Sequence, residues 1–248
     1  MDKAFTVEDK TRRWEYHREI KNLMGRYMFS LLTLREAHIF NDFWAKAHAD
    51  ICLGFNDGWY VGRESIEAYY RAWDESNQAA DGKMKAMFPE KLGEGKELIY
   101  GAGPYNSKPV STCVIEIAGD ERTAKGIWYS RGSKVLLTEA GTVSYWTCGM
   151  YAVDFVLEDG TWRLWHMMYL EDICVPGGQS WGKPIQNYPA VAGFENAAVL
   201  YQDIPAPDVP ERLWESYSPD RPFRKFPDFP KPYDSFEETF SYGYRKEA

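Results

Sequence analysis

Residues 142–173 read TVSYWTCGMYAVDFVLEDGTWRLWHMMYLEDI, and this stretch decides the fold. Two runs rich in β-branched and aromatic residues flank Asp159-Gly160, a dipeptide that favours a tight turn between antiparallel strands. The same arrangement precedes it in residues 109–118 (PVSTCVIEIA) and 123–132 (TAKGIWYSRG), with a turn at Gly119-Asp120. The four runs together predict an antiparallel meander.

Helical patterns precede these strands. Apolar residues recur at helical spacing over residues 14–31 and again over residues 34–47. Residues 49–55 (ADICLGF) predict a short strand, and Gly62 opens a third helix with a narrow aromatic and aliphatic face. Helices followed by an antiparallel meander define an α+β fold rather than a parallel α/β fold.

The composition of the chain changes after Cys174. Most of its 14 prolines lie there among many aromatic residues, without a helical or strand period. Because disordered segments usually lack aromatic residues, we expect residues 174–248 to form an ordered, extended arm. This arm would pack on the domain of residues 1–173 or on a neighbouring subunit. The aromatic arm and the aromatic sheet together predict a homodimer or higher homo-oligomer.

Length and charge limit the partners. A chain of 248 residues has material for one core with an appendage. Its net charge of −8 would repel phosphate backbones and anionic lipids, so we expect neither nucleic-acid nor membrane binding.

The sequence contains no apolar run of about 18 residues and no apolar signal core, which predicts a cytoplasmic protein. The four cysteines are far apart and form no CxxC, which predicts reduced thiols without disulfides or zinc.

Three segments resemble one superfamily, in this order: IKNLMGRY (20–27), VGRESIEAYY (61–70) and GMYAVDFVLEDGTWRLW (149–165). They are similar to the SnoaL-like and nuclear transport factor 2-like proteins, which include ketosteroid isomerases, scytalone dehydratase and polyketide cyclases. The resemblance covers roughly residues 12–173. It implies a cone-shaped, curved antiparallel or mixed sheet wrapped around N-terminal helices, with a largely apolar cavity. It also implies catalysis without metal or nucleotide, by proton transfer beside a carbonyl or phenol, although some relatives only bind.

Tyr27 and His166 are the leading catalytic candidates. Tyr27 matches the tyrosine that donates a hydrogen bond to the oxyanion in ketosteroid isomerases, and its alternative role is a core aromatic. His166 is the only histidine in the strand region, and a period of two places it on one face with Trp162 and Leu164. If that face lines the cone, His166 is the best general base or acid. Its alternative is a half-buried histidine on the outer, oligomer-forming face.

Two acids could assist these residues. Asp154 lies one strand earlier, where the resemblance to ketosteroid isomerases implies a protonated aspartate, and its alternative is a surface charge. The resemblance to ketosteroid isomerases also implies a catalytic aspartate shortly before the third helix. Asp57 is the nearest acid to that position, although residues 56–58 (NDG) also predict a turn. Scytalone dehydratase and many relatives carry a histidine where this chain has Ser107-Lys108-Pro109. This departure argues against the dehydratase mechanism in unchanged form.

Several ring-bearing residues could bind a flat ligand, with core packing as the alternative. The candidates are Trp128, Tyr129, Tyr151, Trp162 and His48. The sequence therefore predicts a cofactor-independent lyase or isomerase that acts on a hydrophobic aromatic or polycyclic small molecule. Dehydration, retro-aldol cleavage and double-bond migration all fit this prediction. The alternative is a non-catalytic binding or assembly protein. Tyr27 and His166 opening onto one cavity would favour the enzyme, and an all-apolar cavity would favour the binding protein.

Overall fold

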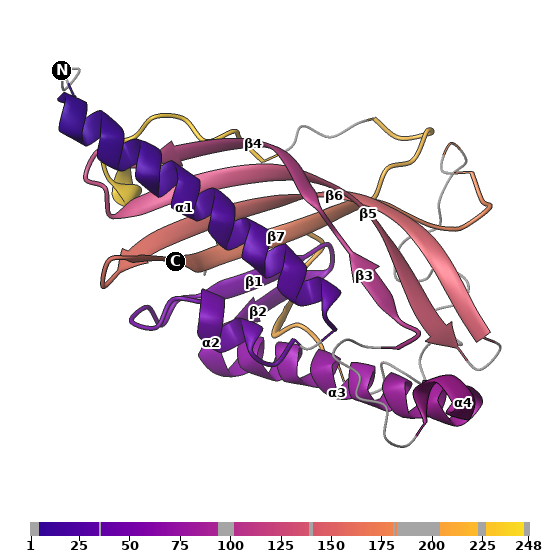
Figure 1. Cartoon of the computed structure of the whole chain (residues 1–248). Helices are drawn as coiled ribbons and strands as arrows, with labels where there is room; N and C mark the ends of the chain where they lie inside the picture. The colour runs from indigo at the N-terminus through magenta and orange to yellow at the C-terminus, as the bar shows by residue number, and fades with distance from the viewer. Residues whose placement is uncertain are drawn as a thin grey trace.

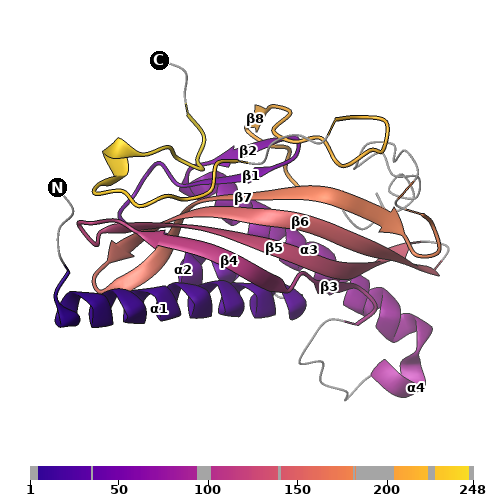
Figure 2. The ribbon, with the colours of Figure 1, turned by 90° about the horizontal axis from the view of Figure 1, so that it is seen from above.

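The computed structural model describes residues 5–34, 36–93, 102–138, 141–180, 182, 204–222 and 227–245. A curved mixed sheet carries helices on one face and C-terminal segments on the other, as Figure 1 and Figure 2 show. This architecture confirms the predicted α+β fold. The elements are α1 (Val7–Leu32), α2 (Ile39–Phe43), β1 (Cys52–Phe55), β2 (Gly58–Val61), α3 (Arg63–Met87), α4 (Pro89–Leu92), β3 (Tyr105–Ser107), β4 (Val110–Ile117), β5 (Thr123–Thr138), β6 (Gly141–Glu158), β7 (Thr161–Pro176), β8 (Val209–Pro210) and the short 3-10 helix η1 (Phe236–Glu238).

Three long antiparallel strands, β5, β6 and β7, form the centre of the sheet. β3 and β4 pair with different parts of β5, and β1, β2 and β8 follow beyond β7. The β1–β7 pair is parallel, which makes the sheet mixed. The predicted meander is confirmed in β4 to β7. Its last turn holds Asp159 and Gly160 at positive φ angles of 47° and 73°, as a two-residue hairpin connection requires.

One irregularity in β7 changes which side chains face the helices. Asp154 of β6 pairs with His166, but the next residue, Phe155, pairs with Leu164. Trp165 is therefore an extra residue, and the pair contains a β-bulge. Because a bulge shifts the alternation of side chains by one residue, Leu164 and His166 point to opposite faces. A second bulge occurs at Asp172.

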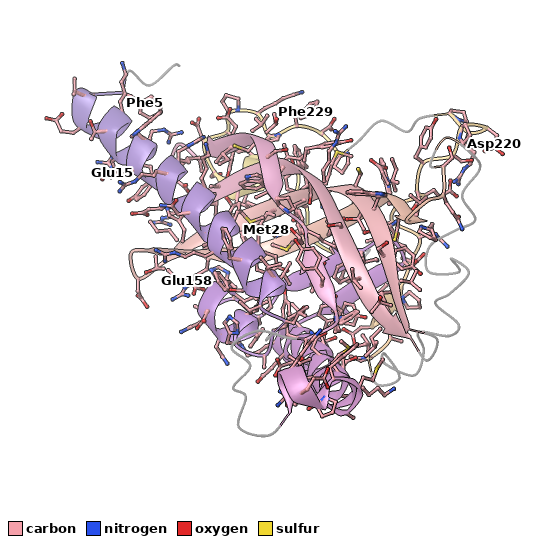
Figure 3. All side chains as sticks on the ribbon, turned by 45° about the vertical axis from the view of Figure 1, so that its right-hand side comes forward. Phe5, Glu15, Met28, Glu158, Asp220 and Phe229 are labelled. Carbon is pink, nitrogen blue, oxygen red and sulfur yellow. The ribbon has the colours of Figure 1, made fainter. Side chains whose placement is uncertain are left out.

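A capping box starts α1 earlier than the predicted residue 14. The Asp9 N–H donates to the Thr6 hydroxyl at 3.1 Å, and the Asp9 carboxylate accepts from the Thr6 N–H at 3.0 Å. Figure 3 shows Met28 on the side of α1 next to the strands and Glu15 on the other side. None of the described helices is both long enough and apolar enough to cross a membrane.

The helix predicted over residues 34–47 is wrong in its length, because among the described residues of this segment only Ile39–Phe43 is helical. Leu34 has a positive φ of 56°, which interrupts a helix before α2. After α2, Trp44 is extended and forms a parallel bridge to Leu164, and the Ala45 N–H donates to the Leu164 carbonyl at 2.8 Å. Pairing with β7 therefore replaces the last predicted helical turn.

The C-terminal arm, here residues 204–222 and 227–245, lies on the face of the sheet opposite the helices (Figure 2). Val209 of β8 pairs with Trp59 at the edge of β2. In the second part, Tyr242 is 1% exposed, and its N–H donates to the Asp154 carboxylate at 2.8 Å. Residues 183–203 of the predicted arm lie outside the described residues.

Buried charges hold the second part of the arm to the sheet. Lys125 Nζ lies 2.6 Å from one oxygen of Asp154, and His166 Nδ1 lies 2.9 Å from the other. Ser241 Oγ donates to the same Asp154 oxygen as His166 at 2.9 Å. Aromatic rings of the arm surround the Lys125 ammonium, with the Phe236 centroid at 4.4 Å. The arm thus shields an ion pair that would otherwise face solvent.

We predict that Gly243→Ala weakens this attachment. A Cβ at Gly243 would lie 2.6 Å from Cγ of His166, so the ring or the arm must move. We expect the free energy of unfolding to fall by about 1–3 kcal/mol, measured by urea denaturation. Gly82→Ala is the control, because a Cβ at this position would meet nothing within 4 Å. The substitution also replaces a glycine inside a helix. That variant should gain about 0.5–1 kcal/mol. Equal stability of Gly243→Ala and wild type would show that the close approach is dispensable.

Candidate functional site

A cavity of about 260 Å³ lies between the helices and the sheet. Side chains from α1 and α3 line one side, and side chains from β1, β2, β5, β6 and β7 line the other. Its volume is close to the lower end of the range for small-molecule sites. Asp57 and Tyr105 are the more exposed lining residues, and Pro207 of the arm also contributes. The cavity is the candidate functional site.

Aromatic side chains form a large part of the cavity wall. The rings are Tyr27, Phe55, Tyr60, Tyr69, Tyr70, Trp73, Tyr105, Tyr151 and Tyr169. The hydroxyls of Tyr27 and Tyr70 share a hydrogen bond of 2.9 Å, and Trp44 Nε1 donates to the Tyr70 hydroxyl at 3.3 Å. Burial raises the pKa of Tyr27, so its hydroxyl stays protonated and can donate.

A carboxylate shared by two lysines forms the charged part of the cavity. Glu171 is 3% exposed, and its two oxygens lie 3.9 Å from Nζ of Lys108 and 3.9 Å from Nζ of Lys134. The Tyr169 hydroxyl donates to Glu171 at 3.2 Å, and the Lys108 ammonium lies 4.0 Å from the centre of the Tyr169 ring. Burial lowers the pKa of Lys108, while the charge of Glu171 opposes that shift. Two lysine side chains therefore lie at ion-pair distance from one buried carboxylate.

Glu36 is a second buried acid on the cavity wall. Glu36 is 4% exposed, and burial raises the pKa of its carboxyl to about 8. The positive charge of Lys108 opposes this rise, and the negative charge of Asp74 adds to it. The Glu36 N–H also donates to the Asp74 carboxylate at 3.2 Å. Near neutral pH the Glu36 carboxyl is therefore mostly protonated, with a usable fraction ionised.

Two amide side chains on the cavity wall have unused hydrogen-bonding atoms. The Nδ2 of Asn77 and the Oδ1 of Asn106 are buried and have no hydrogen-bond partner within the described parts of the chain. A buried amide without a partner costs free energy. A bound molecule that carries both an acceptor and a donor would remove this cost.

Asn56 and the arm hold Glu171 in place. The Glu171 N–H donates to Asn56 Oδ1 at 2.8 Å, and Asn56 Nδ2 donates back to the Glu171 carbonyl at 2.9 Å. The Ser216 hydroxyl donates to the same carbonyl at 2.9 Å. On the outer face, Trp214 Nε1 donates to Asp172 Oδ1 at 2.7 Å. The β1–β2 turn and the arm thus fix the strand from which Glu171 reaches the cavity.

Three of the residues predicted from the sequence line the cavity: Tyr27, Asp57 and Tyr151. Tyr151 is buried, and its ring centre lies 4.5 Å from that of Tyr169. Asp57 lies at the more exposed side, where its carboxylate pairs with Arg212 of the arm at 3.0 Å. The structure therefore brings Tyr27 and Tyr151 to the inside and leaves Asp57 partly exposed.

His166 and Asp154 lie on the opposite face of the sheet, under the arm. The expectation that His166 opens onto the same cavity as Tyr27 is wrong, because the bulge at Trp165 reverses the alternation on which it rested. Burial alone would lower the pKa of His166, but hydrogen bonds with Asp154 and Asp50 outweigh burial and raise it. The Asp154 carboxylate is fully buried and already bound on both oxygens.

Trp128 and Trp162 face the helices but do not line the cavity. Trp128 packs edge-on against Phe155 at 5.8 Å between ring centres. Trp162 packs in the same way against Tyr16, in the first half of α1, at 5.3 Å. The prediction that these two residues contact a ligand is therefore wrong. Both pack in the core, because α1 covers that end of the sheet.

Tyr129 and His48 also lie outside the cavity. Tyr129 is 40% exposed, whereas its neighbour Trp128 faces the helices. His48 lies against Trp165, with 4.9 Å between ring centres, beside the β6–β7 turn. Neither residue is placed to contact a ligand in the cavity.

Four charged residues of the cavity were not predicted from the sequence: Glu36, Lys108, Lys134 and Glu171. Lys108 carried the clearest signal, because it lies in the segment Ser107–Pro109, where the resemblance to scytalone dehydratase implies a histidine. Lys134 lies in β5 beyond the end of the predicted strand at residue 132. Regular alternation from Leu164 would place Glu171 on the outer face, and only the bulge at Trp165 turns it toward the cavity. Glu36 lies in a segment predicted to be helical, where no pattern separated it from a surface acid.

The described residues contain no group of three or more His, Cys, Asp or Glu side chains that could hold a metal ion. The cavity instead combines a carboxyl that titrates near neutrality, protonated tyrosines and ammonium groups within aromatic walls. Such an arrangement can transfer a proton and stabilise an oxyanion.

We predict that Glu36→Gln changes how stability depends on pH. The raised pKa means that folded Glu36 holds a proton that the unfolded chain releases above about pH 4.5. Folding stability therefore falls as the pH rises toward 8, by an amount on the order of 3 kcal/mol. Thermal melts at pH 5 and pH 8 should show a smaller decline for Glu36→Gln than for wild type. Glu67→Gln, on the exposed face of α3, is the control and should follow wild type. A parallel decline in all three proteins would contradict the assignment.

The fold resembles that of LinA, with 12% identity and a TM-score of 0.50, covering 71% of this chain and 99% of that chain. A hexachlorocyclohexane dehydrochlorinase, LinA type 2, has 13% identity and a TM-score of 0.44 over 71% and 98% of the two chains. A protein assigned as a scytalone dehydratase from Novosphingobium aromaticivorans has 14% identity and a TM-score of 0.46 over 69% and 99%. Such low identities bear on the fold alone. No curated protein matches the sequence.

The SnoaL-like domain family matches residues 12–168, which is more than half of the chain. The match begins in α1 and ends within β7, so it includes Glu36, Lys108 and Lys134. Glu171 and the arm follow the matched segment. The sequence match and the architecture agree with each other and with the three segments quoted above. The chain belongs to the SnoaL-like family.

Proposed function

We propose that this protein is a cofactor-independent lyase or isomerase that acts on an aromatic small molecule in the cavity. The observation that carries the proposal is Glu36, a buried carboxyl whose pKa is raised to about 8 on the wall of that cavity. Membership in the SnoaL-like family supports a reaction of this type. A homo-oligomeric state and a cytoplasmic location stay predictions.

Glu36 is the proposed proton-transfer group. Its ionised form would take a proton from the carbon beside a carbonyl, and its protonated form would return that proton to a leaving hydroxyl or to another carbon. A pKa near the working pH serves both steps, because each form is populated. This role replaces the one predicted for His166, which lies on the other face of the sheet.

Tyr27 is the proposed oxyanion donor. The Tyr70 hydroxyl accepts from Trp44 and can donate to Tyr27, which leaves the Tyr27 proton for a group in the cavity. Lys108 and Lys134 would stabilise negative charge that develops on the substrate. Because these groups are polar, the cavity favours an enzyme over a protein that only binds apolar compounds.

A β-hydroxy ketone tests the proposal. In 4-hydroxy-4-phenylbutan-2-one, dehydration would give benzalacetone and retro-aldol cleavage would give benzaldehyde and acetone. Deuterium uptake beside the ketone would report proton transfer alone. We expect at least one of these reactions, and we expect Glu36→Gln to slow it by roughly a hundredfold or more. Tyr27→Phe should slow it by roughly a hundredfold with little loss of stability.

Tyr16→Phe is the matched control for Tyr27→Phe, because Tyr16 packs on Trp162 away from the cavity. Its turnover should equal that of wild type. If wild type and Glu36→Gln gave the same product and exchange rates, Glu36 would have no part in the chemistry. Binding of the ketone without any exchange or product would favour the non-catalytic alternative.

A further inference from the structure

Lys108 places a primary amine on the wall of the cavity. Its side chain is 16% exposed, and its Nζ lies 4.0 Å from the centre of the Tyr169 ring, which lines the same cavity. Nζ also lies 3.9 Å from Glu171, which is an ion-pair distance but is too long for a hydrogen bond. Because burial disfavours the charged form, an amine in such surroundings loses its proton more readily than an exposed amine. A neutral amine that faces a cavity is a nucleophile.

The charges around Lys108 act on its amine in both directions. Burial has the largest effect on the pKa of Lys108 and lowers it, and the nearby positive charge of Lys134 lowers it further. The carboxyls of Glu171 and Glu36 and the thiol of Cys174 oppose these effects. The net shift is downward, so more of Lys108 than of an exposed lysine is neutral near pH 7. Burial next to a second cation is one way in which proteins activate a lysine for attack on a carbonyl carbon.

Two carboxyl groups on the same wall could assist such an attack. Glu36 is mostly protonated near neutral pH, and its charge and that of Lys108 influence each other. The Glu171 carboxylate accepts from the Tyr169 hydroxyl at 3.2 Å and faces the Lys108 nitrogen. A protonated carboxyl can give its proton to a leaving water molecule, and a fixed carboxylate stabilises a cationic nitrogen. Imine formation requires both of these groups beside the amine.

We propose that Lys108 forms an imine with the ketone or aldehyde carbonyl of the substrate, and that the reaction passes through this covalent intermediate. This inference deepens the proposed function and rests on it in one respect, namely that the substrate occupies this cavity. It makes Lys108 a catalytic residue and restricts the substrate to carbonyl compounds. The positive charge that stabilises the reacting carbon is then carried by the iminium nitrogen itself.

The covalent step balances with the groups of the cavity. The lone pair of the Lys108 nitrogen forms a bond to the carbonyl carbon, and one N–H proton moves to the carbonyl oxygen. The new hydroxyl leaves as water with the proton of the Glu36 carboxyl, which gives a cationic iminium and a Glu36 carboxylate. This carboxylate is the base that the next step needs.

Retro-aldol cleavage illustrates the next step. The Glu36 carboxylate takes the proton of the β-hydroxyl, the bond between the α and β carbons breaks, and its electron pair forms an enamine. The β carbon leaves as an aldehyde. The enamine takes the proton from Glu36 on its carbon, and water hydrolyses the resulting iminium. Hydrolysis releases the ketone, restores the amine of Lys108 and returns a proton to Glu36.

Reduction by sodium cyanoborohydride traps an imine in the wild-type protein. The probe is 4-phenylbutan-2-one, which has the carbonyl of the test substrate but no hydroxyl to lose. Trapping should add the mass of the ketone less one oxygen atom, and peptide mapping should place the adduct on Lys108. At pH 7 we expect Lys108 to react roughly tenfold or more faster than Lys83, on the exposed face of α3. No adduct on Lys108, or one formed no faster than on Lys83, would overturn the inference.

A matched probe and two variants complete this test. The alcohol 4-phenylbutan-2-ol, which has no carbonyl, should give no adduct at any lysine. Lys108→Met should lose the adduct, whereas Lys83→Met should keep it. Because trapping uses the wild-type protein, it tests the imine even if a Lys108 variant fails to fold.

Exchange of the carbonyl oxygen distinguishes an imine from an enolate. Each cycle of imine formation and hydrolysis replaces this oxygen by one from water, whereas enolisation leaves it in place. The wild type should therefore remove an isotopically labelled oxygen from 4-phenylbutan-2-one faster than buffer does, as measured by mass spectrometry. Lys108→Arg keeps the positive charge but is no nucleophile, so its exchange should be slower by at least roughly tenfold. Exchange at the wild-type rate in Lys108→Arg would refute the covalent role.

The outcomes separate this inference from the proposed function. Loss of both turnover and oxygen exchange in Lys108→Arg would support both. Turnover of the hydroxy ketone without trapping or oxygen exchange would leave the proposed function standing and refute the imine. Trapping and oxygen exchange at Lys108 in a protein that shows neither product nor deuterium uptake would support the imine and refute the proposed function.

Discussion

The bulge at Trp165 is the constraint from which the rest of the site follows. One extra residue in β7 turns His166 toward the arm and Met167, Tyr169 and Glu171 toward the helices. Regular alternation from the preceding residues would reverse both sets. Glu171 would then leave the cavity, and the two lysines would lose the carboxylate that they share. The imidazole would move away from Asp154, which would leave that buried carboxylate without one of its partners.

The two faces of the sheet bury charge in different ways. On the outer face, Asp154 binds Lys125, His166 and two groups of the arm, so both of its oxygens are occupied within the protein. On the inner face, Glu171 is shared by two ammonium groups at longer distances and opens onto a cavity. A closed network of the first kind stabilises and positions an element. A network of the second kind, which opens onto a cavity, is suited to a ligand.

Much of the fold followed from sequence patterns, whereas the site followed only in part. The meander, the three helices and the inward position of Tyr27 depend on periodicity and turn residues, which are local properties. The face of His166 depends on a single inserted residue in a pairing between strands, and no local pattern in TWRLWHMM reveals it. Glu36 becomes a site residue through burial by distant parts of the chain. Lys108 lies in a segment that departs from the resemblance described above, whereas no sequence signal pointed to its partner Glu171.

The arm contacts the site through main-chain atoms as well as through the side chains of Trp214 and Ser216. The Leu213 N–H donates to the Asn56 carbonyl at 2.8 Å, and the Tyr217 N–H donates to the Asp172 carbonyl at 2.7 Å. Because such contacts do not depend on side-chain identity, Leu213 and Tyr217 can be replaced without loss of these hydrogen bonds. The number of residues between Leu213 and Tyr217 is constrained, since one inserted residue would move Trp214 and Ser216 out of register. Divergent homologues should therefore vary here in composition while keeping the same spacing.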